Sequence, residues 1–219
     1  MKVVVFDVDG TLTPIGSSWH YLHLVLGTRA RSEAFKRAFF NSLISYEEWV
    51  YLDLSLWKGL SYETFKRVLD SIPWRSGIEE LKKLIAEFSG EALFIAISCG
   101  FKELVERCIK DLGFNCGVGV EVEVDDRGRL TGRPRKFVSM WSKGEELQDI
   151  LECLRGEDIS LLVSIGDSVV DTPLFELSDI SIAFCPSKDL LARYRDIDIV
   201  IKSCDLRKLV SVLAKILRS

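Results

Sequence analysis

Residues 2–13 read KVVVFDVDGTLT, an apolar run that gives way abruptly to acidic and hydroxyl side chains. The run at 2–6 is rich in valine and shorter than an ordinary helix, so it predicts a buried strand. The polar stretch at 7–13 is then a loop at the carboxyl end of that strand. In sheets of parallel strands, ligands bind at this end, so we expect the loop to carry functional groups.

Later segments repeat this pattern of short apolar runs separated by helical ones. Runs typical of buried strands lie at 93–97, 161–165, 180–184 and 197–201. Apolar residues recur with helical period at 77–88, 101–112, 142–154, 172–177 and 206–217. Alternating valine and glutamate at 118–124, with a turn at 125–128 and a return at 129–131, predicts a hairpin. The order predicts an α/β fold, a Rossmann-like, doubly wound and mostly parallel sheet with helices on both faces.

The segment between the first two predicted strands is different in character. From residue 17 to about 72, aromatic and aliphatic side chains recur at helical spacing, and Pro73 ends the block. We expect about four short helices and no strand in this insertion. Its aromatic side chains either line an apolar substrate pocket or form the core of a helical bundle. Any of these side chains that are left exposed would suit a homodimer interface. The aromatic residues include Trp19, Phe39, Trp49 and Trp57.

Composition narrows the range of partners and locations. The 219 residues are 47% hydrophobic and 28% charged with a net charge of −4, which is typical of a globular protein in solution. Neither a basic surface for nucleic acid nor a polybasic run for a membrane surface is indicated. The apolar stretches fall short of the roughly 18 residues that a membrane span needs. We therefore expect a cytoplasmic protein with no nucleic-acid or membrane partner.

Cysteine and histidine are present without the spacing of a metal site. The six cysteines contain no Cys-x-x-Cys pair, which argues against zinc, and we expect buried reduced thiols. The alternative is a structural disulfide, as found in the cytosolic proteins of hyperthermophiles. The scarcity of asparagine and glutamine, which is typical of thermophile proteins, favours this alternative. His20 and His23 have no evident third ligand. A structural or surface role is expected for them, and a metal or proton-relay role is the alternative.

Polar residues follow three of the predicted strands and should therefore meet at one edge of the sheet. In chain order they are Asp7, Asp9, Thr11, Ser98, Cys99, Gly100, Asp167 and Asp171, and Lys143 opens the predicted helix between the last two of these groups. Carboxylates crowded together repel one another unless a cation lies between them. Mg²⁺ suits a site made of oxygen ligands, so the cluster predicts a bound magnesium ion.

These residue types suit the transfer of a phosphoryl group. An aspartate has an ordinary pKa of about 3.9, so Asp7 can act as a nucleophile without an activating base. Asp9, two residues away, can protonate the leaving group and then take a proton from water. Lys143 adds positive charge. The hydroxyls of Thr11 and Ser98 and the backbone N–H groups of Cys99 and Gly100 can bind phosphate oxygens.

In this order, the residues resemble the four motifs of haloacid dehalogenase (HAD) superfamily phosphatases. The motifs are Asp7-Val8-Asp9-Gly10-Thr11-Leu12-Thr13, Ser98, Lys143, and Gly166-Asp167 with Asp171. Further segments are similar to the phosphoserine phosphatase branch. These are Ser98-Cys99-Gly100-Phe101, Ser142-Lys143-Gly144-Glu145, Ile182-Ala183-Phe184-Cys185 and Gly128-Arg129-Leu130-Thr131-Gly132.

The resemblance implies a Mg²⁺-dependent hydrolase that acts on a small phosphorylated metabolite through a phospho-aspartyl intermediate. It implies that Asp7 is both nucleophile and metal ligand, and that Asp9 binds the metal through its backbone carbonyl. Asp167 completes the metal site, Asp171 orients it, and Ser98 and Lys143 hold the phosphoryl group. It also implies a helical cap of the C1 type at 14–72 and a catalytic core formed by 1–13 and 73–219.

Three positions depart from the phosphoserine phosphatase pattern. That branch uses a cap glutamate and a cap arginine to hold the serine ammonium and carboxylate, and Gly16 and Asp53 align with them. Val170 stands where an asparagine usually precedes the last aspartate. An acid in place of the arginine cannot bind a carboxylate, so we expect a substrate other than phosphoserine.

Two other functions use a similar set of residues. A phosphotransferase of the same family would pass the phosphoryl group to a hydroxyl other than water. A receiver-like, non-catalytic phosphate-binding module also phosphorylates an aspartate beside Mg²⁺. Receivers are about half this length and lack a cap, and they do not need Asp9, so the hydrolase is the preferred hypothesis.

Overall fold

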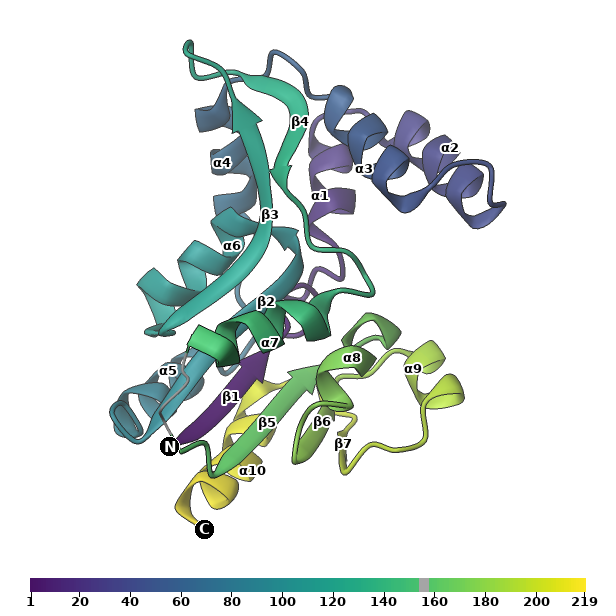
Figure 1. Cartoon of the computed structure of the whole chain (residues 1–219). Coiled ribbons are helices and arrows are strands. Elements are labelled where there is room, and N and C mark those ends of the chain that lie inside the picture. Colours follow the sequence, from purple (N-terminus) through teal and green to yellow (C-terminus); the bar gives the residue numbers. More distant parts are fainter. Residues whose placement is uncertain (154–157) are drawn as a thin grey trace.

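A computed structural model describes residues 1–153 and 158–219. In that part of the chain, seven strands form one sheet in the order β4-β3-β2-β1-β5-β6-β7 (Figure 1). The strands are β1 (Lys2–Phe6), β2 (Ala92–Phe101), β3 (Cys116–Val124), β4 (Leu130–Lys136), β5 (Leu161–Gly166), β6 (Ile180–Phe184) and β7 (Ile199–Ile201). All neighbours pair in parallel except β3 and β4, which form the predicted hairpin. The predicted α/β fold with a mostly parallel sheet is confirmed.

Helices cover both faces of this sheet, because alternate side chains of a strand point to opposite sides. Val4 of β1 belongs to a large apolar cluster with α5 and α10 on one face. Val3 belongs to a smaller cluster with α7 and α8 on the other. The core helices are α5 (Ile78–Glu87), α6 (Lys102–Arg107) continued by a π-helical turn (Cys108–Leu112), α7 (Lys143–Cys153), α8 (Thr172–Phe175), α9 (Lys188–Arg193) and α10 (Leu206–Arg218). Residue 154, the predicted end of the helix at 142–154, lies outside the described residues.

Helix α9 was missed by the sequence prediction. Its start carries a recognisable signal, because the Ser187 side chain accepts a hydrogen bond from the backbone N–H of Leu190. A serine at this position satisfies one of the free N–H groups at a helix start. Residues 188–193 are too few to show a helical period clearly, so only the cap could have predicted them.

The segment between β1 and β2 begins with four helices, as predicted, and they stand above the carboxyl ends of the strands (Figure 1). They are α1 (Ser18–Val25), α2 (Arg29–Phe40), α3 (Tyr46–Ser55) and α4 (Tyr62–Asp70). Ser17, Ser45 and Ser61 cap three of them. The bounds 14–72 for a separate cap stay a prediction.

The β3–β4 hairpin runs alongside these helices and is hydrogen-bonded to the segment between α3 and α4 (Figure 1). Gly59 and Tyr62 donate backbone hydrogen bonds to Leu130 and Gly128, and Leu130 donates one to Leu60. Side chains of the helices also join the apolar cluster of the core, among them Leu54 and Phe65. The helical segment therefore rests on the core through both backbone and apolar contacts. Within the described part of the chain, none of the helices has the length and apolarity needed to cross a bilayer.

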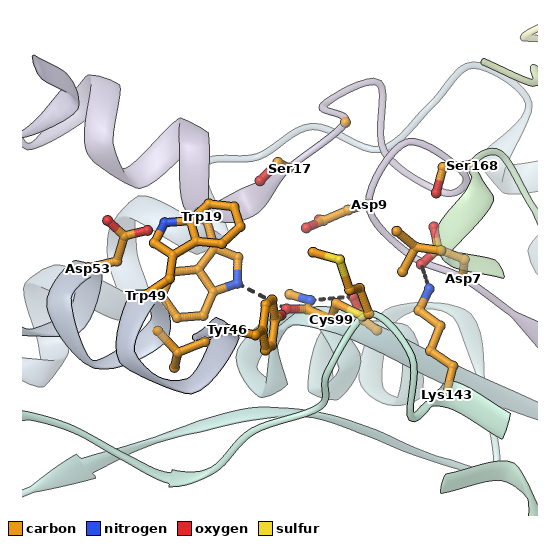
Figure 2. Close-up of a pocket in the computed structure, with 16 residues that line it drawn as sticks. Asp7, Asp9, Ser17, Trp19, Tyr46, Trp49, Asp53, Cys99, Lys143 and Ser168 are labelled. Atoms are coloured by element: carbon orange, nitrogen blue, oxygen red, sulfur yellow. Dashed lines mark hydrogen bonds and ion pairs between the residues drawn. The ribbon is translucent and has the colours of Figure 1, made fainter. Parts of the chain in front are cut away.

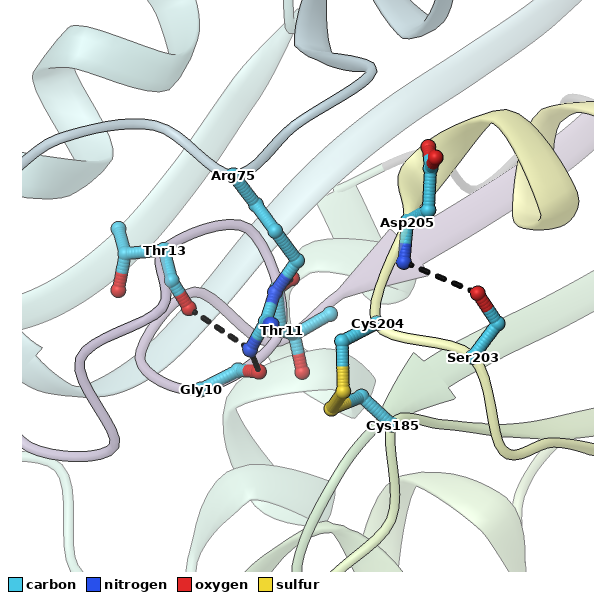
Figure 3. Close-up of a disulfide and its surroundings, with 8 residues drawn as sticks. All are labelled: Gly10, Thr11, Thr13, Arg75, Cys185, Ser203, Cys204 and Asp205. Carbon is cyan, nitrogen blue, oxygen red and sulfur yellow. Dashed lines mark hydrogen bonds between the residues drawn. A yellow bond between two sulfur atoms is a disulfide. The ribbon is translucent and has the colours of Figure 1, made fainter.

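A disulfide joins Cys185, which follows β6, to Cys204, which precedes α10 (Figure 3). Their Cα atoms are 4.7 Å apart. The expectation of reduced thiols is therefore wrong for these two residues, because the crossover through β7 brings them together across 19 positions of sequence. Cys99, Cys108, Cys116 and Cys153 are free.

Removing this disulfide is expected to destabilise the protein by about 3 kcal/mol, the loop-closure entropy of a ring of this size. Cys185→Ser, Cys204→Ser and the double variant should lose the same amount, because each change breaks the same bond. Urea denaturation without reductant measures the loss, and reductant should reproduce it in the unmodified protein. Cys153→Ser, at an exposed free thiol, is the control. Equal stability of the unmodified protein, the reduced protein and the three variants at Cys185 and Cys204 would contradict the prediction.

Candidate active site

Three acidic side chains meet at the carboxyl ends of β1 and β5. Phe6 pairs with Ile165 in the parallel register, so the residues that follow each strand lie side by side. As a result, carboxylate oxygens of Asp7, Asp167 and Asp171 lie within 4.8 Å of one another. The parallel register therefore brings these acids together at one edge of the sheet, as predicted.

Lys143, the first residue of α7, reaches into this cluster and is almost completely buried. Its Nζ lies 2.5 Å from Oδ1 of Asp7 (Figure 2) and 2.6 Å from Oδ1 of Asp171. Burial alone lowers the pKa of Lys143, but Asp171 and Asp7 raise it well above its usual value. The ammonium is therefore charged at neutral pH, and it fixes one oxygen of Asp7.

The other oxygen of Asp7, Oδ2, is buried and has no hydrogen-bond partner among the described residues. Burial raises the pKa of Asp7, Lys143 lowers it, and Asp171 and Asp167 raise it again, so the pKa of Asp7 lies well above its usual value. A divalent cation beside Oδ2 would oppose that rise by favouring the ionised form. The free oxygen and the crowded negative charge together fit a hard cation such as Mg²⁺.

Asp171 has both of its oxygens engaged by protein groups. Oδ2 accepts hydrogen bonds from the backbone N–H groups of Asp167 and Ser168, at 3.0 and 2.9 Å, while Oδ1 contacts Lys143. Gly166 must lack a side chain, because a Cβ there would lie 2.4 Å from Cγ of Asp171. The geometry suits Asp171 to positioning Lys143 and the loop that carries Asp167.

Asp9 faces the helical segment. Its Oδ2 accepts hydrogen bonds from the backbone N–H and the hydroxyl of Ser18, both at 2.7 Å, and Oδ1 is buried with no partner in the described part of the chain. Burial raises the pKa of Asp9 although the Ser18 bonds oppose it. A raised pKa suits a group that must be protonated in one step and ionised in the next. The sequence prediction missed Ser18, whose place at the start of α1 was the available signal.

The strand β2 supplies a second set of predicted residues. The Ser98 hydroxyl is buried and accepts a hydrogen bond from the backbone N–H of Gly100, at 2.9 Å. Burial raises the pKa of the Cys99 thiol to about 12, so it is not a nucleophile at neutral pH. A Cβ at Gly100 would lie 2.5 Å from Oδ2 of Asp9, so only glycine fits beside that acid.

Thr11, like Asp167 and Asp171, is a predicted site residue that does not line the cavity described below. Its hydroxyl is buried and lacks a partner among the described residues, and its carbonyl oxygen accepts a hydrogen bond from Arg75 Nε at 3.1 Å. Arg75 also donates to the carbonyl oxygens of Gly10 and Thr13 (Figure 3). Arg75 thus holds the loop after β1 in place, a role that no local pattern around Pro73 indicated.

A cavity of about 210 Å³ lies between the helical segment and the core (Figure 2). The core contributes the acids, Lys143 and the end of β2, and the helices contribute aromatic rings and one carboxylate. The lining residues are Asp7, Asp9, Gly16, Ser17, Trp19, Tyr46, Trp49, Val50, Asp53, Ser98, Cys99, Gly100, Met140, Lys143, Ser168 and Val170.

Both interpretations of the aromatic residues hold in part. Trp19 and Trp49 line the cavity, whereas Trp57 is buried in the core and Phe39 stacks on Trp49 with ring centroids 4.9 Å apart. His23 has a structural place, because its Nδ1 lies 2.7 Å from the Thr28 hydroxyl.

The raised pKa of Asp167 can be tested by the pH dependence of the protein's thermal stability. Burial and then the charge of Asp171 raise its pKa from 3.8 to about 7. The folded protein therefore binds the proton of the Asp167 carboxyl more tightly than the unfolded chain does. The protonated carboxyl contributes its full stabilisation below pH 3.8, and this stabilisation is lost as the pH rises to about 7. Asp167→Asn keeps a neutral side chain at every pH. Without metal, its melting temperature should increasingly exceed that of the unmodified protein between pH 4 and 8, and a constant difference would contradict this.

Comparisons with known proteins agree with this geometry. The sequence profile described as haloacid dehalogenase-like hydrolase matches residues 4–176. A phosphoserine phosphatase of Archaeoglobus fulgidus is 28% identical over 185 residues, which are 84% of this chain and 52% of the relative, so the chain spans about half that relative's length. A phosphoserine phosphatase of Campylobacter jejuni subsp. doylei is 27% identical over 215 residues, 97% of this chain and 100% of the relative. A solved structure of a phospho-aspartyl intermediate analogue of phosphoserine phosphatase superposes with a TM-score of 0.76 at 25% identity, covering 96% of this chain and 98% of that one.

Proposed function

Because this chain belongs to the haloacid dehalogenase-like hydrolases and is a phosphoric monoester hydrolase, we propose that it cleaves a small phosphomonoester through a phospho-aspartyl intermediate on Asp7. The observation that carries the proposal is the position of Asp7. One carboxylate oxygen is held by Lys143, the other has no partner among the described residues, and Asp7 lines the cavity beside Asp9. Such an oxygen is placed to attack phosphorus.

Asp7, with Asp167 and the backbone carbonyl of Asp9, would hold Mg²⁺, which would neutralise charge on the phosphoryl oxygens when bound. The Lys143 ammonium and the Ser98 hydroxyl would bind the same oxygens. Asp171 would keep Lys143 and the Asp167 loop in position. Together these residues would supply hydrogen-bond donors, positive charge and metal ligands at the end of the cavity where the carboxylates cluster.

The reaction then needs one nucleophile and one proton carrier. A carboxylate oxygen of Asp7 forms a bond to phosphorus as the bond from phosphorus to the leaving oxygen breaks, and Asp9 gives its proton to that oxygen. Water next attacks the same phosphorus and passes a proton to Asp9, which releases phosphate and restores the Asp7 carboxylate. Asp9 is suited to both steps because its pKa is raised.

The direct test is release of inorganic phosphate from simple alkyl and aryl phosphates by the purified chain with Mg²⁺. Added alcohols should leave the amount of phosphate released per substrate consumed unchanged. Substrate loss without matching phosphate release would instead support a phosphotransferase. No consumption of any ester, with Mg²⁺ present and the fold intact, would contradict the proposal.

Phosphoserine is expected to be a poor substrate. Its carboxylate would meet the carboxylate of Asp53, and its ammonium would lack the acidic partner that the phosphoserine phosphatase pattern has at Gly16. No lysine or arginine other than Lys143 is among the described lining residues. We expect kcat/KM for phosphoserine to be about tenfold or more below that for ethyl phosphate, which lacks both charged groups. Phosphate release under matched conditions measures the ratio. Efficient hydrolysis of phosphoserine would show that another group binds its carboxylate.

A further inference from the structure

The side of the cavity away from the catalytic acids combines aromatic rings with one carboxylate. Tyr46, Trp49 and Asp53 line the cavity from a single face of α3, because residues three and four apart are neighbours on a helix. Trp19 of α1 adds a third ring. Figure 2 shows Asp53 and Asp7 at opposite ends of the lining, with the rings between them.

Contacts with neighbouring residues hold the three rings in place. Trp19 donates from Nε1 to the carbonyl oxygen of Cys99, at 2.9 Å, and packs against Phe101 with centroids 4.4 Å apart. Trp49 stacks on Phe39. Tyr46 meets Trp141 edge to face, with centroids 5.4 Å apart. A ligand that uses these rings therefore loses little free energy in ordering them.

Asp53 is buried with little compensation for its charge. Only 4% of its surface is exposed, and its one polar partner among the described residues is His23, whose Nε2 lies 3.3 Å from Oδ1. That contact lacks hydrogen-bond geometry, and Oδ1 has no other partner in the described chain. A buried carboxylate of this kind is costly unless a positive group lies beside it. Lys143, the only lysine or arginine among the described lining residues, is engaged by Asp7 and Asp171 at the other end.

We propose that the leaving group of the substrate carries an alkylated ammonium, bound by the rings of Trp19, Tyr46 and Trp49 and by the carboxylate of Asp53. The inference rests on the proposed phosphatase function. Aromatic faces attract cations, and quaternary ammonium groups are recognised by sets of such rings. The substrate is then a small zwitterion, with its phosphate at the Asp7 end of the cavity and its ammonium at the Asp53 end.

The first experiment compares two esters of the same shape. Phosphocholine and 3,3-dimethylbutyl phosphate differ by the exchange of a charged nitrogen for a neutral carbon, so their ratio of kcat/KM isolates the effect of the charge. We expect phosphocholine to be favoured about tenfold or more by the intact chain with Mg²⁺, the range of a desolvated cation against aromatic rings. Equal values for the two esters would overturn the inference.

Two variants test which residues recognise the positive charge of the ammonium group. Asp53→Asn keeps the size of the side chain and removes its charge, and Trp49→Leu keeps an apolar side chain and removes the ring. In each variant, the ratio for phosphocholine over the neutral ester should fall toward one. Val50→Ala, at a lining residue of α3 without charge or ring, should leave the ratio unchanged. A ratio that stays high in both Asp53→Asn and Trp49→Leu would also overturn the inference.

Binding can be measured without turnover in the Asp7→Asn variant. Titration of this variant with phosphocholine should change the tryptophan fluorescence and give a lower Kd than titration with the neutral ester. Failure of the two proposals is therefore distinguishable. Hydrolysis of both esters at equal rates with equal Kd values rejects the ammonium and keeps the phosphatase, whereas tighter binding of phosphocholine without hydrolysis of any ester rejects the phosphatase and keeps the cation site.

Discussion

Replacing Asp7 with asparagine is expected to lower kcat by roughly four orders of magnitude or more, the scale seen when a nucleophile is removed. An amide oxygen carries no full negative charge, so it cannot form the acyl phosphate that the carboxylate of Asp7 would form. The substitution also takes away one of the two carboxylates that contact Lys143. Phosphate release under saturating substrate, measured over hours to detect residual turnover, is the appropriate readout.

The control for this experiment is an aspartate with no part in the cavity. Asp70 lies on the surface of α4, where it pairs with Lys66, and Asp70→Asn should retain full activity. Circular dichroism should show that Asp7→Asn is folded, because a buried lysine that loses one carboxylate keeps the other. Turnover by folded Asp7→Asn within tenfold of the unmodified protein would exclude Asp7 as the nucleophile.

Removal of divalent metal is expected to abolish activity, and added Mg²⁺ should restore it. Without the ion, the acids beside Asp7 repel a phosphate dianion as well as one another. Excess EDTA followed by titration with MgCl₂ measures both effects. The same titration, followed by melting temperature, should show stabilisation, because an ion that binds only the folded protein shifts the folding equilibrium.

Asp167→Asn should raise the Mg²⁺ concentration required for half-maximal activity and reduce the thermal stabilisation by Mg²⁺. Asp167 belongs to the acidic cluster and takes no part in the contacts of Lys143, so the substitution tests the metal site separately from the lysine. Asp149→Asn, at an exposed position of α7, is the control. Activity that persists in EDTA, or a magnesium titration unaltered by Asp167→Asn, would exclude this site.

Much of the catalytic end of the site was predictable because it depends on local patterns and one general rule. An apolar run followed by Asp7 marks a strand and the loop after it, and the segment at 161–167 repeats the arrangement. Parallel strands place such loops at one edge of the sheet, so the clustering of Asp7, Asp167 and Asp171 follows without knowledge of side-chain contacts. The resemblance to the hydrolase family, which rests on these same segments, is confirmed.

The substrate end of the cavity was not predictable to the same degree. Asp53 could be aligned with a family position, but its contact with His23 depends on how α1 packs against α3. Likewise, the disulfide of Cys185 and Cys204 and the hold of Arg75 on the loop after β1 join segments distant in sequence. No short pattern encodes such contacts.

The order of residues along the chain was therefore sufficient for the α/β fold and for the acids and lysine that would perform the chemistry, because strand period and parallel pairing are properties of the backbone. Which rings and charges surround the rest of the substrate was settled only by three-dimensional packing. Helix–helix contacts are made by side chains whose neighbours come from remote parts of the chain, and their geometry depends on the whole apolar core.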